Sequence, residues 1–271
     1  MYTIERYTIP ELVEKSSARY ADRPALAMVG GDPVLYRDLE PRTRRIAAFL
    51  GLLGIKKGDR VAILSENKPE WGLSYFGIAR CGAIAVPIMV DFLSEQISTI
   101  HELSETKVLL VSRRLAAKVA AEGDRRILVS IDDFSVISAP GGAEAVAALV
   151  ADAAVERAAG AFASPKVEAD ELASILYTSG TMGKSKGVML THRNLVFDAE
   201  AARKFIVLRR TDRLLSILPL AHSYEFTIGF LIPMLQGSAV YYLDRPPSAT
   251  ALLPALAAIR PTLVLSVPLV I

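Results

Sequence analysis

A segment rich in glycine and lysine, placed between two short apolar runs, constrains this chain more than any other stretch. Residues 175–177 form the first run and residues 188–190 the second, and each predicts a buried strand. After the second run, Thr191 and Asn194 offer capping oxygens to a helix that extends towards Phe205. The pattern therefore predicts a strand, a polar loop, a second strand and a helix.

The loop carries the donors that a polyphosphate needs. Gly180, Gly183 and Gly187 are expected to adopt positive φ and let the backbone approach a ligand closely, so that successive N–H groups converge on one anion. Hydroxyl and ammonium groups add further donors, and these belong to Thr178, Ser179, Thr181, Lys184 and Lys186. A polar hairpin turn without a ligand is the simpler alternative, and the density of these groups disfavours it.

Residues 183–185, Gly-Lys-Ser, also resemble the end of a Walker A loop, G-x-x-x-x-G-K-[ST]. That motif needs glycine at the position of Thr178 and a helix that starts at Lys184. Instead, Gly187 and the β-favouring Val188 follow within a turn. A P-loop NTPase or kinase is therefore an alternative that a strand at residues 188–190 would exclude.

Residues 177–194 resemble the signature loop of the adenylate-forming (AMP-binding) superfamily, which includes acyl-CoA synthetases, luciferases and peptide-synthetase adenylation domains. The family form is approximately Y-T-S-G-T-T-G-x-P-K-G-V-x-x-T-H-x-N. Met182 stands where Thr is usual, which removes one hydroxyl, and Ser185 stands where Pro is usual, which leaves the loop less rigid. Lys186 and the glycines match the family form.

Other segments extend the resemblance over most of the chain. Residues 57–63 and 82–87 look like two early family strands. Residues 218–225, Leu-Pro-Leu-Ala-His-Ser-Tyr-Glu, look like the segment that enters the acyl site of long-chain acyl-CoA synthetases. The resemblance implies that residues 1–271 belong to a large N-terminal adenylation domain with two packed αβαβα-type layers. It assigns residues 60–208 to a first sheet subdomain, and residues 1–59 plus 209–271 to an incomplete second one.

Hydrophobic periodicity predicts an α/β fold in which strands and helices alternate, which implies mostly parallel sheets covered by helices on both faces. Helices are expected at residues 10–20, 38–53, 69–81, 94–104, 191–205, 222–235 and 248–259, and in an alanine-rich connecting segment at residues 139–163. Strands are expected at residues 25–28, 34–36, 61–64, 84–87, 108–111, 127–131, 175–177, 188–190, 214–218, 239–243 and 262–265.

Composition disfavours several classes of protein. The chain has 31 basic and 29 acidic residues, and its net charge of +2 argues against a nucleic-acid-binding surface. Cys81 is the only cysteine and lies in an apolar run, so a buried thiol and a cytoplasmic location are expected. The N-terminus lacks the apolar core of a signal peptide. No run of about 18 or more apolar residues predicts a membrane span.

The resemblance implies a reaction in two steps, catalysed by an ATP-dependent fatty acid–CoA ligase. A carboxylate attacks the α-phosphate of ATP to give an acyl-adenylate and pyrophosphate, and the thiol of coenzyme A then attacks the acyl carbon. Mg²⁺ and lysine reduce the repulsion between the two anions. The resemblance assigns the β and γ phosphates to Thr178, Ser179, Gly180, Thr181, Gly183, Lys184 and Lys186.

The resemblance also assigns roles to two residues outside the loop, and the residues themselves suggest roles for two more. His222 is expected near the α-phosphate and the acyl carboxylate, and Tyr224 is expected to line the acyl pocket. Glu225 is expected to cap the following helix, and His192 to be structural. Three dispersed histidines and one cysteine predict no zinc site.

Family members are far longer and continue to a Mg²⁺-binding Glu, a ribose-binding Asp and a C-terminal domain with a catalytic Lys. We therefore expect these 271 residues to be an N-terminal fragment, inactive without the rest of the same protein. Its apolar end predicts exposed surface and association into a homo-oligomer. A non-catalytic nucleotide-binding module is the remaining alternative.

Overall fold

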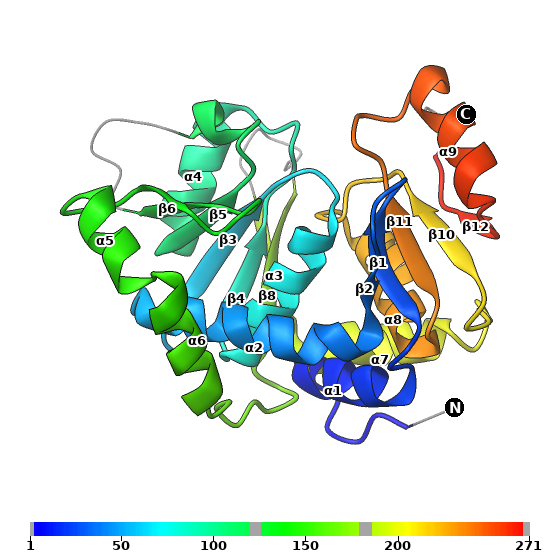
Figure 1. Cartoon of the computed structure of the whole chain (residues 1–271), viewed down its shortest axis with the longest axis horizontal. Coiled ribbons are helices and arrows are strands. Elements are labelled where there is room, and N and C mark those ends of the chain that lie inside the picture. The colour runs from blue at the N-terminus through cyan, green and yellow to red at the C-terminus, as the bar shows by residue number, and fades with distance from the viewer. Residues whose placement is uncertain (1–2, 120–125, 179–185, 268–271) are drawn as a thin grey trace.

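The computed structural model describes residues 3–119, 126–178 and 186–267, and these residues form two β-sheets with helices packed against them (Figure 1). The strand order of the larger sheet is β7-β6-β5-β3-β4-β8-β9. Its strands are β3 (Arg60–Leu64), β4 (Ile84–Pro87), β5 (Val108–Val111), β6 (Ile127–Ser130), β7 (Val136–Ser138), β8 (Leu172–Thr178) and β9 (Lys186–Thr191). The strands from β6 to β8 are parallel, and β7 and β9 pair antiparallel at the two edges.

The smaller sheet combines strands from both ends of the chain in the order β12-β10-β11-β1-β2. Its strands are β1 (Pro24–Met28), β2 (Val34–Leu35), β10 (Arg213–Ser216), β11 (Ala239–Tyr242) and β12 (Leu263–Val264). Strand β1 lies parallel beside β11, while β2 folds back antiparallel on β1. The predicted α/β fold with mostly parallel sheets is therefore confirmed, and the subdomain boundaries at residues 59/60 and 208/209 stay a prediction.

The helices follow the predicted order and lie within a few residues of the predicted positions. They are α1 (Ile9–Arg19), α2 (Tyr36–Leu52), α3 (Pro69–Arg80), α4 (Ser94–Ser104), α5 (Ala143–Leu149), α6 (Asp152–Ala161), α7 (His192–Ala202), α8 (Ile232–Gln236) and α9 (Ala249–Ile259). In the described part of the chain, no helix combines the length and apolar character needed to cross a membrane.

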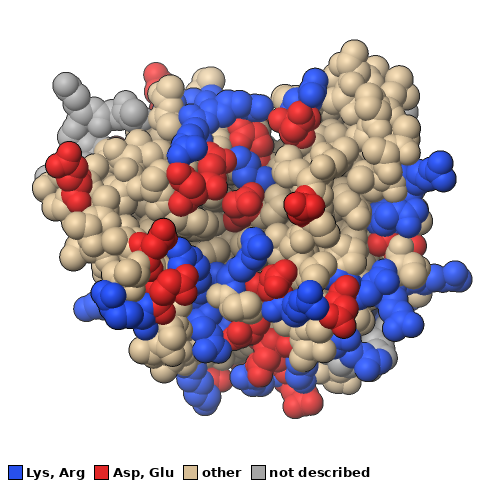
Figure 2. Space-filling model, viewed as in Figure 1, with Lys and Arg blue, Asp and Glu red and all other residues tan. Residues whose placement is uncertain are grey.

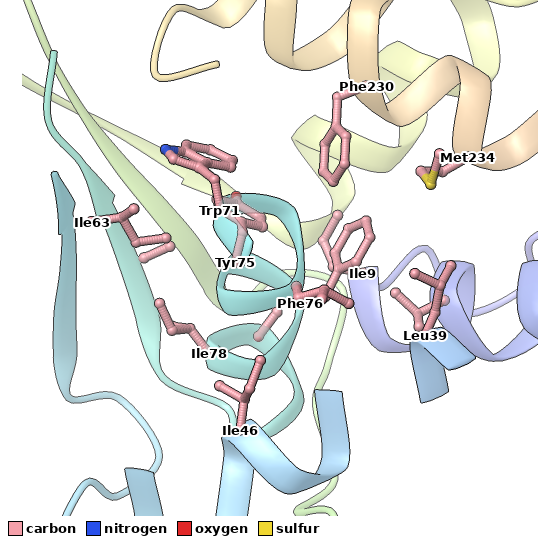
Figure 3. Packing of buried hydrophobic residues seen from close by; sticks show 14 of the residues in the cluster. Ile9, Leu39, Ile46, Ile63, Trp71, Tyr75, Phe76, Ile78, Phe230 and Met234 are labelled. Atoms are coloured by element: carbon pink, nitrogen blue, oxygen red, sulfur yellow. The ribbon is translucent and has the colours of Figure 1, made fainter. Parts of the chain in front are cut away.

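Helix α3 joins the two sheets through one aromatic core. It contacts β3 and β4 of the larger sheet and β1 of the smaller one. Figure 3 shows Trp71, Tyr75 and Phe76 on α3, with Phe230 packed against Phe76. The centroids of the Phe76 and Phe230 rings lie 4.9 Å apart in a stacked arrangement. Because aromatic side chains bury large apolar areas, this cluster holds the two sheets in a common core.

The predicted helix at residues 222–235 is confirmed in extent, and its geometry departs from that of a regular α-helix. Residues 223–224 are α-helical, Glu225–Leu231 form a π-helical segment, and Ile232–Gln236 is α-helical again. Pro233 supplies the physical reason, because proline has no N–H and its ring clashes with the carbonyl four residues earlier in an α-helix. Strand β7, a three-residue edge strand, was not predicted from the sequence.

Cys81 is buried, as predicted, and burial raises the pKa of its thiol to about 11. On the face shown in Figure 2, acidic and basic side chains are interspersed, and the region over α9 is largely uncharged. Leu253 on α9 is 66% exposed.

Candidate active site

Both sheets direct the carboxyl ends of their parallel strands towards one cleft. The cleft is lined by residues that come soon after the strands: Glu66 and Asn67 after β3, Arg114 after β5, residues 217–219 after β10 and residues 243–247 after β11. It encloses about 140 Å³. Ligand sites of α/β sheets lie outside the carboxyl ends of the strands. The topology therefore makes this cleft one of two candidate sites.

The predicted phosphate loop connects the ends of an antiparallel hairpin. Thr178, the last residue of β8, pairs with Lys186, the first residue of β9, and both side chains are exposed. Lys186 makes no ion pair with any acidic side chain in the described ranges, which end at 178 and resume at 186. Its ammonium group is therefore available to an anion at the tip of the hairpin. The other predicted phosphate-binding residues lie outside the described residues, and these are Ser179, Gly180, Thr181, Gly183 and Lys184.

Strand β9 decides against the Walker A alternative. Residues 188–190 are paired in register with β8, with Val188 opposite Leu176 and Leu190 opposite Ser174. A P-loop would require a helix over these residues. The prediction of two strands flanking the loop is confirmed.

Gly187 corrects the expectation of positive φ. It lies in β9 and is not among the glycines with left-handed backbone geometry. An added Cβ would lie 3.0 Å from Ile175 and 3.2 Å from the ring of Tyr177, its partner across the hairpin. Glycine at this position therefore makes room for a neighbouring aromatic ring, which is a packing requirement that the sequence alone did not reveal.

His192 is held in the neutral state at the start of α7. It is almost fully buried, and its Nδ1 accepts a hydrogen bond from the Ile9 N–H at 3.3 Å. Burial lowers the pKa of this imidazole to about 4. Immediately before it, the Thr191 hydroxyl accepts the Asn194 N–H at 3.1 Å and caps the helix as predicted. The structure thus gives His192 a role in joining α1 to α7.

His222 is exposed between β10 and the π-helical segment. Its Nδ1 accepts the backbone N–H of Tyr224 at 3.2 Å. Because Nδ1 is the acceptor, the neutral imidazole carries its proton on Nε2, which can donate to an oxygen anion. The Tyr224 side chain is 42% exposed next to it.

Glu225 is a residue whose importance the sequence analysis missed. The expected helix cap is wrong, because the side chain is buried and its Oε1 accepts a hydrogen bond from the Ser216 hydroxyl at 2.5 Å. Burial raises the pKa of this carboxyl to about 7. The sequence contained a sign of this role, because Glu225 directly precedes the uncharged stretch 226–235.

A second hollow, of about 650 Å³, brings the hairpin and the segment after His222 together. Leu176 of β8 and Leu190 of β9 line it on one side, and Ser223 and Phe226 line it on the other. Thr227 and five residues of α7 complete the lining, and the α7 residues are Arg193, Asn194, Leu195, Phe197 and Asp198. The hollow has an apolar lining with a few polar groups, which suits a ligand with a hydrocarbon part and a charged end.

The described residues contain no group of three or more His, Cys, Asp or Glu side chains that could hold a metal ion. They therefore do not supply a ligand set for the Mg²⁺ that the resemblance implies.

Comparisons with known proteins agree with one family. A family model described as "AMP-binding enzyme" matches residues 13–271. The curated "Long-chain-fatty-acid--CoA ligase FadD15" of Mycobacterium bovis is 34% identical over 227 residues, which covers 82% of this chain and 37% of that protein. The "Long-chain-fatty-acid--[acyl-carrier-protein] ligase AEE15, chloroplastic" of Arabidopsis thaliana is 29% identical over 247 residues, which covers 83% of this chain and 33% of that protein.

The chain thus spans about a third of the length of these two relatives. Among solved structures, apo MatB from Rhodopseudomonas palustris superposes with a TM-score of 0.76 at 23% sequence identity, covering 98% of this chain and 50% of that one. This likeness shows that the two chains share a fold.

Proposed function

The chain belongs to the AMP-binding enzyme family, and we propose that the protein containing it is an ATP-dependent fatty acid–CoA ligase. The observation that carries this proposal is the shared hollow between the β8–β9 hairpin and the segment that follows His222. It would place the phosphate loop and an imidazole donor beside an apolar cavity. The names of the curated relatives support a fatty acid as the substrate that enters it.

We assign roles to the residues as follows. The triphosphate of ATP would bind at the hairpin tip, where Thr178 donates a hydroxyl hydrogen bond and Lys186 a charge-assisted one. The loop residues that complete this set are Ser179, Gly180, Thr181, Gly183 and Lys184. The Nε2–H of His222 would donate to an oxygen of the α-phosphate or of the fatty acid carboxylate, and Tyr224 would contact the acyl chain.

Each step of the proposed reaction balances. A carboxylate oxygen of the fatty acid attacks the α-phosphorus, the bond to the bridging oxygen of the β-phosphate breaks, and pyrophosphate leaves. The coenzyme A thiol then loses its proton and forms a bond to the acyl carbon as AMP leaves. Positive charge and fixed donors stabilise these steps because negative charge accumulates where two anions meet.

The proposal includes a further part of the same protein. Since the chain spans 33% and 37% of the two relatives, we assign the ligands of Mg²⁺ and the catalytic lysine to that part. The described residues lack a ligand set for the metal, so the roles assigned above rest on the side chains of this chain alone. The 271-residue chain by itself is expected to show no turnover.

Exchange of labelled pyrophosphate into ATP, dependent on added fatty acid, tests the proposal in the full-length protein. Lys186→Ala should depress the exchange about 100-fold, because one charged donor to the triphosphate is lost. Lys56→Ala is the matched control, since Lys56 is exposed and precedes β3, at the amino ends of the parallel strands and away from the hairpin tip. Exchange that is unchanged in Lys186→Ala, or absent from the wild-type protein, would contradict the assignment.

The acceptor is tested separately, since the two relatives differ in their named acceptors. Thioester formation is measured with coenzyme A and with a holo acyl-carrier protein under the same conditions. The proposal predicts product with coenzyme A. Product with the carrier protein and none with coenzyme A would leave the proposed adenylation step in place and show that the acceptor is the carrier protein.

A further inference from the structure

Asn67 connects the larger sheet to the segment that carries His222. It lies in the turn between β3 and α3, and its side chain makes three hydrogen bonds to residues 149 to 153 positions away. Its Oδ1 accepts the Leu220 N–H at 2.9 Å, while its Nδ2 donates to the Leu218 carbonyl at 2.6 Å and to the Ser216 hydroxyl at 3.0 Å. The amide orientation is unambiguous, because a backbone N–H can only donate and a carbonyl can only accept.

Ser216 extends this chain of hydrogen bonds into the core. Its hydroxyl accepts from Asn67 and donates to Glu225 Oε1 at 2.5 Å. The carboxyl group fits because residue 229 is glycine, where an added Cβ would lie 2.6 Å from the Glu225 Cδ and Oε1 atoms. Gly229 therefore allows the carboxyl group to occupy its buried position.

The residues between these two anchors include His222. The His222 N–H donates to the Pro219 carbonyl at 2.9 Å, and the Phe226 N–H donates to the His222 carbonyl at 2.9 Å. Asn67 thus holds the chain directly before His222, and the helix that begins at Glu225 holds it directly after. The imidazole itself is exposed, so its position depends on the backbone that carries it.

We infer that Asn67 is a positioning residue, and that the hydrogen bonds through Asn67, Ser216 and Glu225 set the place of the His222 imidazole in the active site. This inference rests on the proposed function for its kinetic consequence. The hydrogen bonds cross between the two sheets, so the network also fixes His222 relative to the carboxyl end of β3 in the larger sheet.

A double-mutant cycle in the full-length protein tests this inference. Asn67→Ala should lower kcat for fatty-acid-dependent pyrophosphate exchange about 10- to 100-fold while the KM for ATP stays near the wild-type value, because misplacing a catalytic group affects the chemical step. In a His222→Ala background, Asn67→Ala should lower kcat further by less than about threefold, because the effects of residues that act through one another are not additive. Effects that multiply would overturn the inference.

Gly229→Ala approaches the same network from its other end and leaves Asn67 and His222 intact. It should displace the Glu225 carboxyl and reproduce the fall in kcat. Ser238→Ala is the control, because Ser238 is also buried and donates to the Arg209 carbonyl, but lies at the amino end of β11, whereas Ser216 lies at the carboxyl end of β10. A Gly229→Ala enzyme with the kcat of the Ser238→Ala control would overturn the inference.

Imidazole ¹⁵N chemical shifts of His222 provide a readout in the 271-residue chain that needs no catalysis. The wild-type chain should show one neutral tautomer protonated on Nε2, and Asn67→Ala should average the two tautomers. An unchanged tautomer in Asn67→Ala would overturn the inference. If the wild-type protein shows no exchange activity, the proposed function fails and the tautomer measurement still decides on the positioning network.

Discussion

The stability of the chain is expected to respond to pH through two buried groups that act in opposite directions. Burial lowers the pKa of His192 to about 4, below its ordinary value of 6.5. As the pH falls through 6.5, the unfolded chain gains a proton that the folded chain does not, so stability falls. Burial raises the pKa of Glu225 to about 7, above its ordinary value of 4.5. The folded chain keeps that proton as the pH rises, so stability falls as the pH rises from 4.5 towards 7.

The two magnitudes follow from the pKa values. Each pH unit between the unfolded and folded pKa corresponds to about 1.4 kcal/mol in the free energy of unfolding. Between pH 7.5 and 5.0, His192 should destabilise the chain by about 2 kcal/mol, because about 1.5 pH units lie below its unfolded pKa. Over the same interval Glu225 should stabilise it by about 2 kcal/mol. The free energy of unfolding of the wild-type chain should therefore change little between these pH values. A variant that lacks one of the two groups should show the pH dependence caused by the other.

His192→Asn isolates the glutamate. An asparagine Oδ1 can take the place of Nδ1 as acceptor for the Ile9 N–H and does not titrate. The variant should gain about 2 kcal/mol in the free energy of unfolding from pH 7.5 to pH 5.0, whereas Glu225→Gln should lose about 2 kcal/mol. Urea unfolding followed by the fluorescence of Trp71, the only tryptophan, measures both.

His222→Asn is the control, because it makes the same substitution at an exposed imidazole. A His192→Asn chain whose stability stays as flat with pH as the wild type would refute the role given to His192 burial.

Two further predictions concern the core and the surface. Phe230→Ala should lower the free energy of unfolding by about 3–5 kcal/mol, because it empties a buried site in the aromatic cluster, whereas Phe205→Ala should change it little, because Phe205 is 88% exposed. Equal losses of the free energy of unfolding in the two variants, measured by urea unfolding, would argue against a stabilising role of the aromatic cluster. Leu253→Glu on α9 should weaken self-association of the chain in sedimentation equilibrium, and an unchanged association constant would exclude this surface.

Periodicity and capping chemistry predicted most of the fold, because these signals are local. Thr191 and Asn194 marked the start of α7, and the alternation after residue 60 indicated the parallel strands of the larger sheet. The π-helical turn escaped prediction although Pro233 follows it closely, since proline marks a distortion without specifying its form.

The candidate site was harder to predict because its contacts join distant parts of the chain. Resemblance of the signature loop and of residues 218–225 to the family pointed to Lys186 and His222, whose roles stay a prediction. Asn67 carried no such signal, since its partners lie about 150 residues away. Gly187 was assigned a ligand-binding geometry because sequence does not show that Tyr177 lies across the hairpin from it.

The fate of one oxygen atom of the fatty acid tests most directly the central claim, that the full-length protein forms an acyl-adenylate. The full-length protein is given ATP, coenzyme A and a fatty acid whose carboxylate carries ¹⁸O, and the nucleotide products are analysed by mass spectrometry. Attack of the carboxylate on the α-phosphorus predicts one ¹⁸O atom in AMP and none in pyrophosphate. Formation of ADP, with ¹⁸O in inorganic phosphate and unlabelled nucleotide, would contradict adenylation by this fold.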